Sequence, residues 1–285
     1  MNMKKMAAVM LGSILAAGLL VGCGGGADKP QAKPDKASEV KIGILTHLNA
    51  SEEKLNEIMK KIDEESSVKL ARNYVYYDML TSMQMGLDSG SIQEMSLYSS
   101  VAKYLSSRND TIMPAEVQGP KLSDSFCCAL RQDDTTLKAE LDKVIVEMKQ
   151  DGTLERLTKE YITDIEKGQE PPAVPIPVTE GAPTLKIAVT GDLPPLDLVK
   201  ADGTAAGFNT AVLSELAKRL GRNVEIIQID SAARASALVS KKVDVVFWAV
   251  VPANNSKLPA DMDKPSGIEL TEPYYTDQII HVKKK

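Results

Sequence analysis

The sequence predicts an α/β protein built from two halves. Short apolar runs of strand length alternate with amphipathic segments of helical period, both before residue 162 and after residue 185. Such alternation is typical of layered α/β folds with a mostly parallel sheet. The stretch 168–183 carries five prolines and separates the two patterned regions. A length of 285 residues allows roughly two domains of ordinary size.

The first half begins with a strand that feeds a helix. Val40 to Leu45 is apolar, and Asn49 and Glu52 provide the start signal of an amphipathic helix. Its apolar positions, at helical spacing, are Leu55, Ile58, Met59 and Ile62. The pattern then predicts strands at 68–76, 92–97 and 126–131 and helices at 80–87, 100–105, 137–148 and 154–162.

The second half restarts after the prolines. Proline cannot continue a helix or a central strand, so we expect 163–184 to be a semi-extended connector. Beyond it the pattern predicts strands at 185–190, 224–229 and 243–250 and helices at 210–220 and 232–239. Two α/β halves joined by a hinge form a cleft, which is where such architectures bind ligands.

The first 23 residues have the pattern of an export signal. Two lysines precede an apolar run from Met6 to Val21, and the small residue Gly22 follows before Cys23. The run is short for a membrane span, which needs about 20 apolar residues. The end Leu-Val-Gly-Cys resembles a bacterial lipobox, which implies that residues 1–22 are a cleaved signal peptide and that Cys23 is acylated. Residues 23–39 lack apolar periodicity and are expected to be a flexible tether.

Composition and charge exclude several classes of function. Hydrophobic residues make up 43% and charged residues 26% of the chain, which is ordinary for a globular protein. The net charge of −5, or −7 without Lys4 and Lys5 of the leader, argues against nucleic acid as a partner. Aromatic residues are only 4%, which weakens any interpretation that needs stacking platforms for bases or sugars.

The residues that commonly carry chemistry are few. Cys127 and Cys128 are neighbours in a predicted strand, so their side chains point to opposite faces and imply no disulfide framework. His47 and His281 fit neither a metal-ligand spacing nor a catalytic triad. No Gly-rich phosphate loop is present. We therefore expect no cofactor and no metal.

Several motifs of the second half occur in the order of a known family. They are LKIAVTGDLPP at 185–195, Gly207-Phe-Asn, AKRLG at 217–221, KVDVV at 242–246 and EPYY at 272–275. Together they resemble the first lobe of the bacterial extracellular solute-binding proteins of family 3, the polar amino-acid type. The resemblance implies a two-lobed periplasmic-binding-protein type II fold with a hinge between the lobes.

The first half resembles what normally comes later in that family. Residues 40–125 are similar to the second lobe, and 126–162 to the returning hinge strand and the closing helices. Residues 185–285 would then be the first lobe, so the chain is expected to be circularly permuted, with 163–184 joining the old termini. Surface termini that lie close together tolerate such a change. The open alternative is a dimer in which lobes pair between chains.

Candidate site residues of the second half follow strand ends. Asp192, beside Leu193, is the best candidate for contacting a ligand amine, although it also fits a turn residue that caps its own backbone. Trp248, beside Ala249, either walls the cleft or packs in the core. In the family an Arg clamps the ligand carboxylate, and 251–255 holds none. Arg234 either replaces that Arg or is a solvated helix residue.

Candidates of the first half lie on the other side of the cleft. Thr46 and Asn49 precede a helix whose N-terminal amides can receive an anion, and Asn49 also fits a plain helix cap. The Asp that binds the ligand amine in the family falls near Tyr98. Tyr77 and Asp78 end a strand and line the cleft, unless Tyr77 packs as core.

These observations predict an extracytoplasmic lipoprotein, anchored to the cell membrane, that binds a small polar solute and delivers it to the permease of an ABC importer. Hinge closure replaces the solute's hydration by fixed hydrogen bonds, with no chemical step. The missing Arg implies either a solute that is not an ordinary α-amino acid or a replacement by Arg234. Alternatives are an enzyme similar to the periplasmic dehydratases, with Asp192 or Asp78 as the acid, and a ligand-sensing lipoprotein without a transporter.

Overall fold

The computed structural model describes residues 40–46, 48, 53, 56–57, 60, 64, 72–116, 121–165, 167–253 and 264–285. The predicted leader, the tether with Cys23, Asn49 and most of the helix expected near 52–62 lie outside these residues. All described residues belong to one compact unit. Within the described chain, no helix is both long and apolar enough to cross a membrane.

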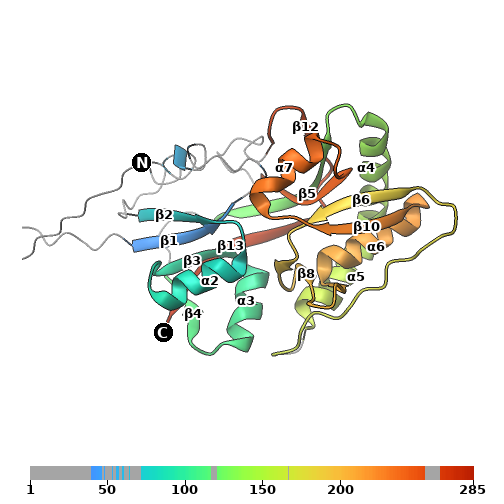
Figure 1. Ribbon diagram of the computed structural model, residues 1–285. Coiled ribbons are helices and arrows are strands. Elements are labelled where there is room, and N and C mark those ends of the chain that lie inside the picture. Colours follow the sequence, from blue (N-terminus) through green and yellow to red (C-terminus); the bar gives the residue numbers. More distant parts are fainter. Residues whose placement is uncertain are drawn as a thin grey trace, which may run out of the picture. The chain divides into compact units, whose positions relative to one another are not determined.

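Most strands join in a single mixed sheet, with the order β10-β6-β11-β5-β13-β3-β1-β2 (Figure 1). The pairs β1–β2, β1–β3, β10–β6 and β11–β6 are parallel, whereas all pairs made by β5 and β13 are antiparallel. The α/β class is confirmed, but the expected mostly parallel sheet is wrong because two antiparallel strands run through its middle. The bounds are β1 Val40–Leu45, β2 Arg72–Tyr77, β3 Glu94–Tyr98, β4 Ile112–Pro114, β5 Ser123–Arg131, β6 Thr184–Val189, β10 Asn223–Gln228, β11 Val245–Pro252, β12 Ile268–Leu270 and β13 Tyr275–Lys284.

The strand β13 connects two groups of elements. Its first part, Tyr275–Gln278, pairs with β5, and its second part, Ile279–Lys283, pairs with β3. We call β1, β2 and β3 with α2 (Leu80–Ser89) and α3 (Ser99–Arg108) the β1 wing. The β6 wing is β6, β10 and β11 with α6 (Phe208–Leu220) and α7 (Ser231–Val239), together with residues 190–207 between β6 and α6. The sequence predicted a hinge strand at 126–131, where β5 lies, but it did not predict β13 as a second strand between the wings.

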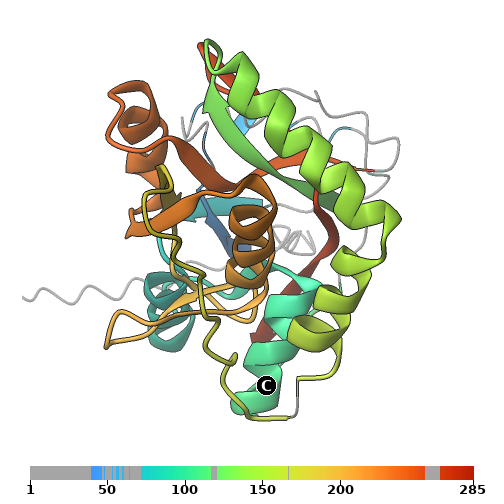
Figure 2. The same ribbon diagram turned by 90° about the vertical axis from the view of Figure 1, so that its right-hand side faces the viewer.

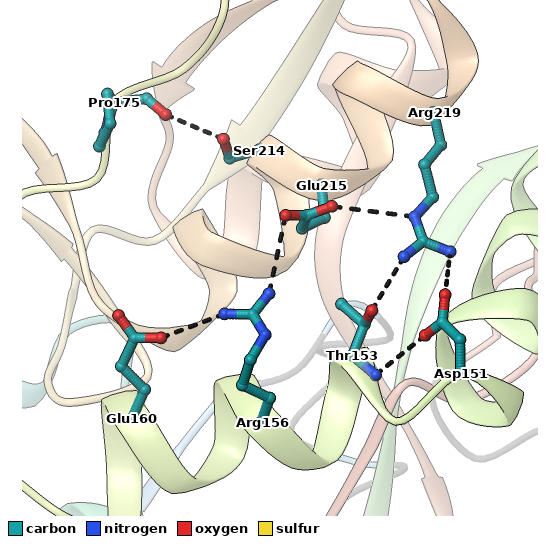
Figure 3. Close-up of polar contacts among 8 residues, drawn as sticks. All are labelled: Asp151, Thr153, Arg156, Glu160, Pro175, Ser214, Glu215 and Arg219. Carbon is teal, nitrogen blue, oxygen red and sulfur yellow. Dashed lines mark hydrogen bonds and ion pairs between the residues drawn. The ribbon is translucent and has the colours of Figure 1, made fainter.

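Helices that follow β5 in the chain pack on the β6 wing. Figure 2 shows α4 (Thr135–Gln150) and α5 (Thr153–Thr158) beside α6, and α5 continues as a π-helical turn, Lys159–Thr163. Arg219 of α6 binds Asp151 Oδ2 at 2.8 Å and donates to Thr153 Oγ1 at 2.9 Å (Figure 3). Residues 126–162 therefore pack with 185–285, which precede them in the family's order.

The proline-rich segment runs along this wing. Ala173 bridges to Ala206, and Ser214 Oγ donates to the Pro175 carbonyl at 2.8 Å (Figure 3). Next to it lies a small sheet that the sequence pattern did not reveal, formed by β7 (Asp192–Leu193), β8 (Asp197–Val199) and β9 (Ala205–Ala206). Its strands are two or three residues long, too short for a periodic signal. Within the segment 191–195, Asp192 and Leu193 thus form a strand of this sheet.

The core extends through the central strands. Residues 124–130 of β5 are all buried, which requires cover on both faces of the sheet. The larger apolar cluster contains Phe126, Cys128 and Leu130, and the smaller one contains Ala129. This alternation agrees with the prediction that Cys127 and Cys128 point to opposite faces. Both cysteines are buried and neither forms a disulfide bond, and burial raises the pKa of the Cys128 thiol.

Candidate functional site

Asp192 of β7 lies where the β6 wing meets the β1 wing. The backbone N–H of Thr81, in the first turn of α2, donates to Asp192 Oδ2 at 3.3 Å, and the Thr81 hydroxyl is 3.5 Å from the same oxygen. Helix α2 has no capping side chain of its own and no acidic residue in its first turn. A carboxylate from the other wing therefore sits at the positive end of this helix.

Other polar groups surround this contact. The Ser231 hydroxyl, at the start of α7, donates to the Asp78 carbonyl at 3.2 Å, which brings α7 next to the entry of α2. Thr46 Oγ1 donates to Asp78 Oδ1 at 2.7 Å. Asp230 is the charged group that acts most strongly on Asp192. The exposed Asp230 thus acts on the buried Asp192, and the exposed Asp78 lies at the entry of the helix that Asp192 contacts.

Burial sets the protonation of Asp192. Only 8% of the residue is exposed, and this desolvation raises the pKa of its carboxyl group. Hydrogen bonds from α2 lower the pKa, but they do not offset the burial, and the charge of Asp230 raises it further. The carboxylate is therefore easier to protonate than an exposed aspartate.

Asp197 organises the loop that carries Asp192. Its Oδ2 accepts hydrogen bonds from the backbone N–H groups of Thr190 and Gly191, at 3.0 and 3.1 Å. Burial raises the pKa of Asp197 to about 6, although these two donors and the positive charge of Arg234 lower it in part. The sequence analysis missed Asp197, because an aspartate after Pro-Pro-Leu carries no signal of burial.

Arg234 and Trp248 form a stacked pair inside the β6 wing. The guanidinium carbon lies 5.0 Å from the centre of the Trp248 ring, and Nη1 donates to the Trp248 carbonyl at 3.1 Å. Arg234 is 0% and Trp248 2% exposed. Trp248 has a φ of 77°, at a register shift between Phe247 and Ala249. Non-glycine residues adopt such a φ only where their surroundings enforce it.

A second group of carboxylates lies where β5 and β13 meet α3. Asp124 and Asp277 are opposite each other in the ladder between the two strands, and both are buried. Tyr98 Oη donates to Asp124 Oδ2 at 3.1 Å, while Asp277 caps α3 by accepting from the Ser100 N–H and from the Ser99 and Ser100 hydroxyls. Burial raises the pKa of Asp124 to about 6.

The structure brings some of the predicted site residues together and places others elsewhere. Asp192, Thr46 and Asp78 lie at the meeting point of the wings, and Tyr98 lies at the base of α3, with its ring 6.1 Å from that of Trp248. Leu193 and Ala249 are buried. Tyr77 is half-buried and packs over Gly86 of α2, where even a Cβ would clash with its hydroxyl. Asn49 lies outside the described residues.

Several polar residues of this region escaped the sequence analysis. Thr81, Asp124 and Asp277 act through partners far away in the chain, so no local spacing identifies them. In the described part of the chain, no three His, Cys, Asp or Glu side chains are grouped to hold a metal. His281 pairs with Glu94 at 2.9 Å. A shallow, open cavity of about 360 Å³ lies beside Arg219, whose guanidinium is already bound to Asp151.

One family of known proteins matches part of this chain. Residues 185–285 match the model of the bacterial extracellular solute-binding proteins, family 3. The match covers about a third of the chain and includes the β6 wing from Leu185 onward, together with β12 and β13. None of the curated proteins matches this chain.

Solved structures with some similarity include three binding proteins. A ligand-binding component of an ABC-type import system from Staphylococcus aureus, with zinc bound, has 11% identity and a TM-score of 0.44, and the aligned parts cover 86% of this chain and 65% of that one. The GluR0 ligand-binding core in complex with L-glutamate has 12% identity and a TM-score of 0.44, with coverages of 88% and 86%. A nutrient-binding protein from Burkholderia cenocepacia bound to methionine has 15% identity and a TM-score of 0.40, with coverages of 86% and 84%. At such scores these likenesses add nothing to the argument from the described elements.

Proposed function

We propose that this protein is an extracytoplasmic solute-binding protein that holds a small polar solute between its β1 and β6 wings. The observation that carries the proposal is the family match of 185–285, combined with the contact of Asp192, within that segment, with Thr81 of the other wing. A solute bound there would touch both wings. Binding would then bias the wings toward the closed arrangement by the difference in its affinity for the two states.

The proposal includes a permuted order of lobes. The family match falls on the last third of the chain, and the helices that follow β5 pack on the wing formed by that segment. A rearranged chain tests this order: it starts at Thr184, joins Lys285 to Val40 through a Gly-rich linker and ends at Thr163. We expect it to be monomeric and to bind the same solute as the parent chain. A dimer of the parent chain in size-exclusion light scattering would instead favour lobes exchanged between two chains.

The proposed partners are the permease of an ABC importer and the membrane. Cys23 would carry the lipid anchor, and the tether 23–39 would hold the folded body away from the membrane surface. Metabolic labelling with a fatty acid tests the anchor, since label should enter the wild type and not the Cys23→Ala variant. Equal labelling of both would rule out an anchor at Cys23.

Ligand-observed NMR with the purified chain tests solute binding. The panel holds amino acids, amines, small carboxylates and cyclohexadienyl acids. Broadening of one solute class, with its signals unchanged over hours, is the expected result. Replacement of solute signals by those of new products would instead favour the dehydratase-like enzyme, and an unchanged spectrum across the panel would contradict a solute-binding role.

A further inference from the structure

One oxygen of the Asp192 carboxylate has a partner and the other does not. Oδ2 faces the first turn of α2, whereas Oδ1 is fully buried and accepts no hydrogen bond from any described residue. A buried polar atom without a partner costs folding free energy, so most are paired in native proteins. The position of Asp192 Oδ1 is fixed, because Oδ2 of the same carboxylate is hydrogen-bonded to Thr81 of the β1 wing.

Apart from the positive end of α2, the charges that act on Asp192 or lie at the entry of that helix are negative. Asp230 raises the pKa of Asp192 by repulsion, and Asp78 lies next to Ser231 at the entry of α2. The buried cation Arg234 stacks on Trp248, and its charge acts on Asp197. An anionic group placed here would be repelled by several carboxylates, whereas an ammonium group would relieve their repulsion.

We propose that the solute is a small organic cation, whose primary ammonium group donates a hydrogen bond to Asp192 Oδ1 while Oδ2 stays on α2. This inference rests on the proposed function and names its substrate class. The cation needs an ionised Asp192, so its binding weakens as the pH falls.

A series of solutes with equal length and different charge tests the inference. Isothermal titration calorimetry on the full chain compares 1,4-diaminobutane, 4-aminobutanoate and butanedioate, which share four carbons in a row. We expect the diamine to bind at least tenfold more tightly than the zwitterion, and the dianion not to bind. Asp192→Asn keeps the shape of the side chain and should weaken diamine binding at least tenfold. Glu225→Gln removes an exposed charge from the same wing and should leave it unchanged.

Two further measurements test the inference even if Asp192→Asn does not fold. Asp230→Asn removes the neighbouring charge from a helix start that it does not cap through its side chain, and we expect it to weaken diamine binding a few-fold. Lowering the pH should weaken diamine binding to the wild type as well. Diamine binding that survives Asp192→Asn in a folded variant overturns the inference, and so does a diamine that does not bind. The broader NMR panel judges the solute-binding role separately, because an anion that binds there would leave that role intact.

Discussion

Arg234 lies fully buried against the face of Trp248 and donates a hydrogen bond to the carbonyl of that same residue. The contact holds Trp248 in its left-handed backbone conformation at the register shift of β11. The charge of Arg234 also favours the ionised form of Asp197, whose carboxylate fixes the loop before Asp192. One side chain therefore supports two of the segments that meet the β1 wing.

Replacing Arg234 should destabilise the protein strongly. Arg234→Met fills a similar volume but removes the donor to the buried Trp248 carbonyl, and a buried polar group that loses its partner costs about 1 to 3 kcal/mol. Arg234→Lys keeps the charge and loses the planar stack, so we expect a smaller loss. Urea unfolding followed by fluorescence measures both, because Trp248 is the single tryptophan of the chain. A small change in stability with a large loss of solute affinity would instead identify Arg234 as a solute clamp.

Asp124 should make stability depend on pH. Burial raises its pKa from 3.8 to about 6, so the folded protein holds this proton more tightly than the unfolded chain does. This contribution is fully present below pH 3.8 and is lost as the pH rises through about 6; it amounts to at most about 3 kcal/mol. Asp124→Asn keeps an acceptor for Tyr98 and should reduce the pH slope of the unfolding free energy between pH 4 and 6. Identical slopes in variant and wild type would contradict the assignment to Asp124.

The elements that the sequence predicted well have local signals. The expected strand 185–190 corresponds to β6, and the expected helix 210–220 lies within α6, which ends at the left-handed Gly221. In contrast, buried and exposed residues do not simply alternate along β13, because this strand pairs first with β5 and then with β3. The strands β4 and β12 are three residues long, too short for any period.

The candidate site was predictable only in part, for a related reason. A strand end identified Asp192, but its partner Thr81 lies 111 residues away and belongs to the other wing. The backbone conformation of Trp248 depends on a β-bulge and on the buried Arg234 of α7, and the local sequence around residue 248 predicts neither. Pairings between distant segments decide these details, and a single sequence does not record them.

Gly207, directly before α6, should not tolerate a side chain. Its φ is +94°, and a Cβ there would lie 2.6 Å from the Pro195 carbonyl oxygen. Gly203 also has a positive φ, of +83°, but open space surrounds its Cβ position. Gly203→Ala therefore measures the backbone cost alone, about 1 kcal/mol, and Gly207→Ala should cost at least about 2 kcal/mol more. Chemical denaturation of the pair checks this; equal losses would show that the segment 195–207 shifts without cost.

Two arginines that join α5 to α6 should differ in their effect on stability (Figure 3). Arg219 is mostly buried and binds Asp151, Thr153 and Glu215, whereas the more exposed Arg156 pairs with Glu160 and Glu215 at 3.2 and 3.7 Å. Exposed ion pairs contribute little, because water and salt screen them and the side chains lose entropy. We expect Arg219→Met to lower Tm by about 2 to 4 °C and Arg156→Met by less than half as much. Differential scanning calorimetry at low and at 1 M salt measures both. Part of the Tm loss in Arg219→Met should persist at high salt, because the hydrogen bond from Arg219 to the Thr153 hydroxyl involves a neutral partner. Equal Tm losses for both variants at 1 M salt would show that Arg219 contributes only as a screened surface charge.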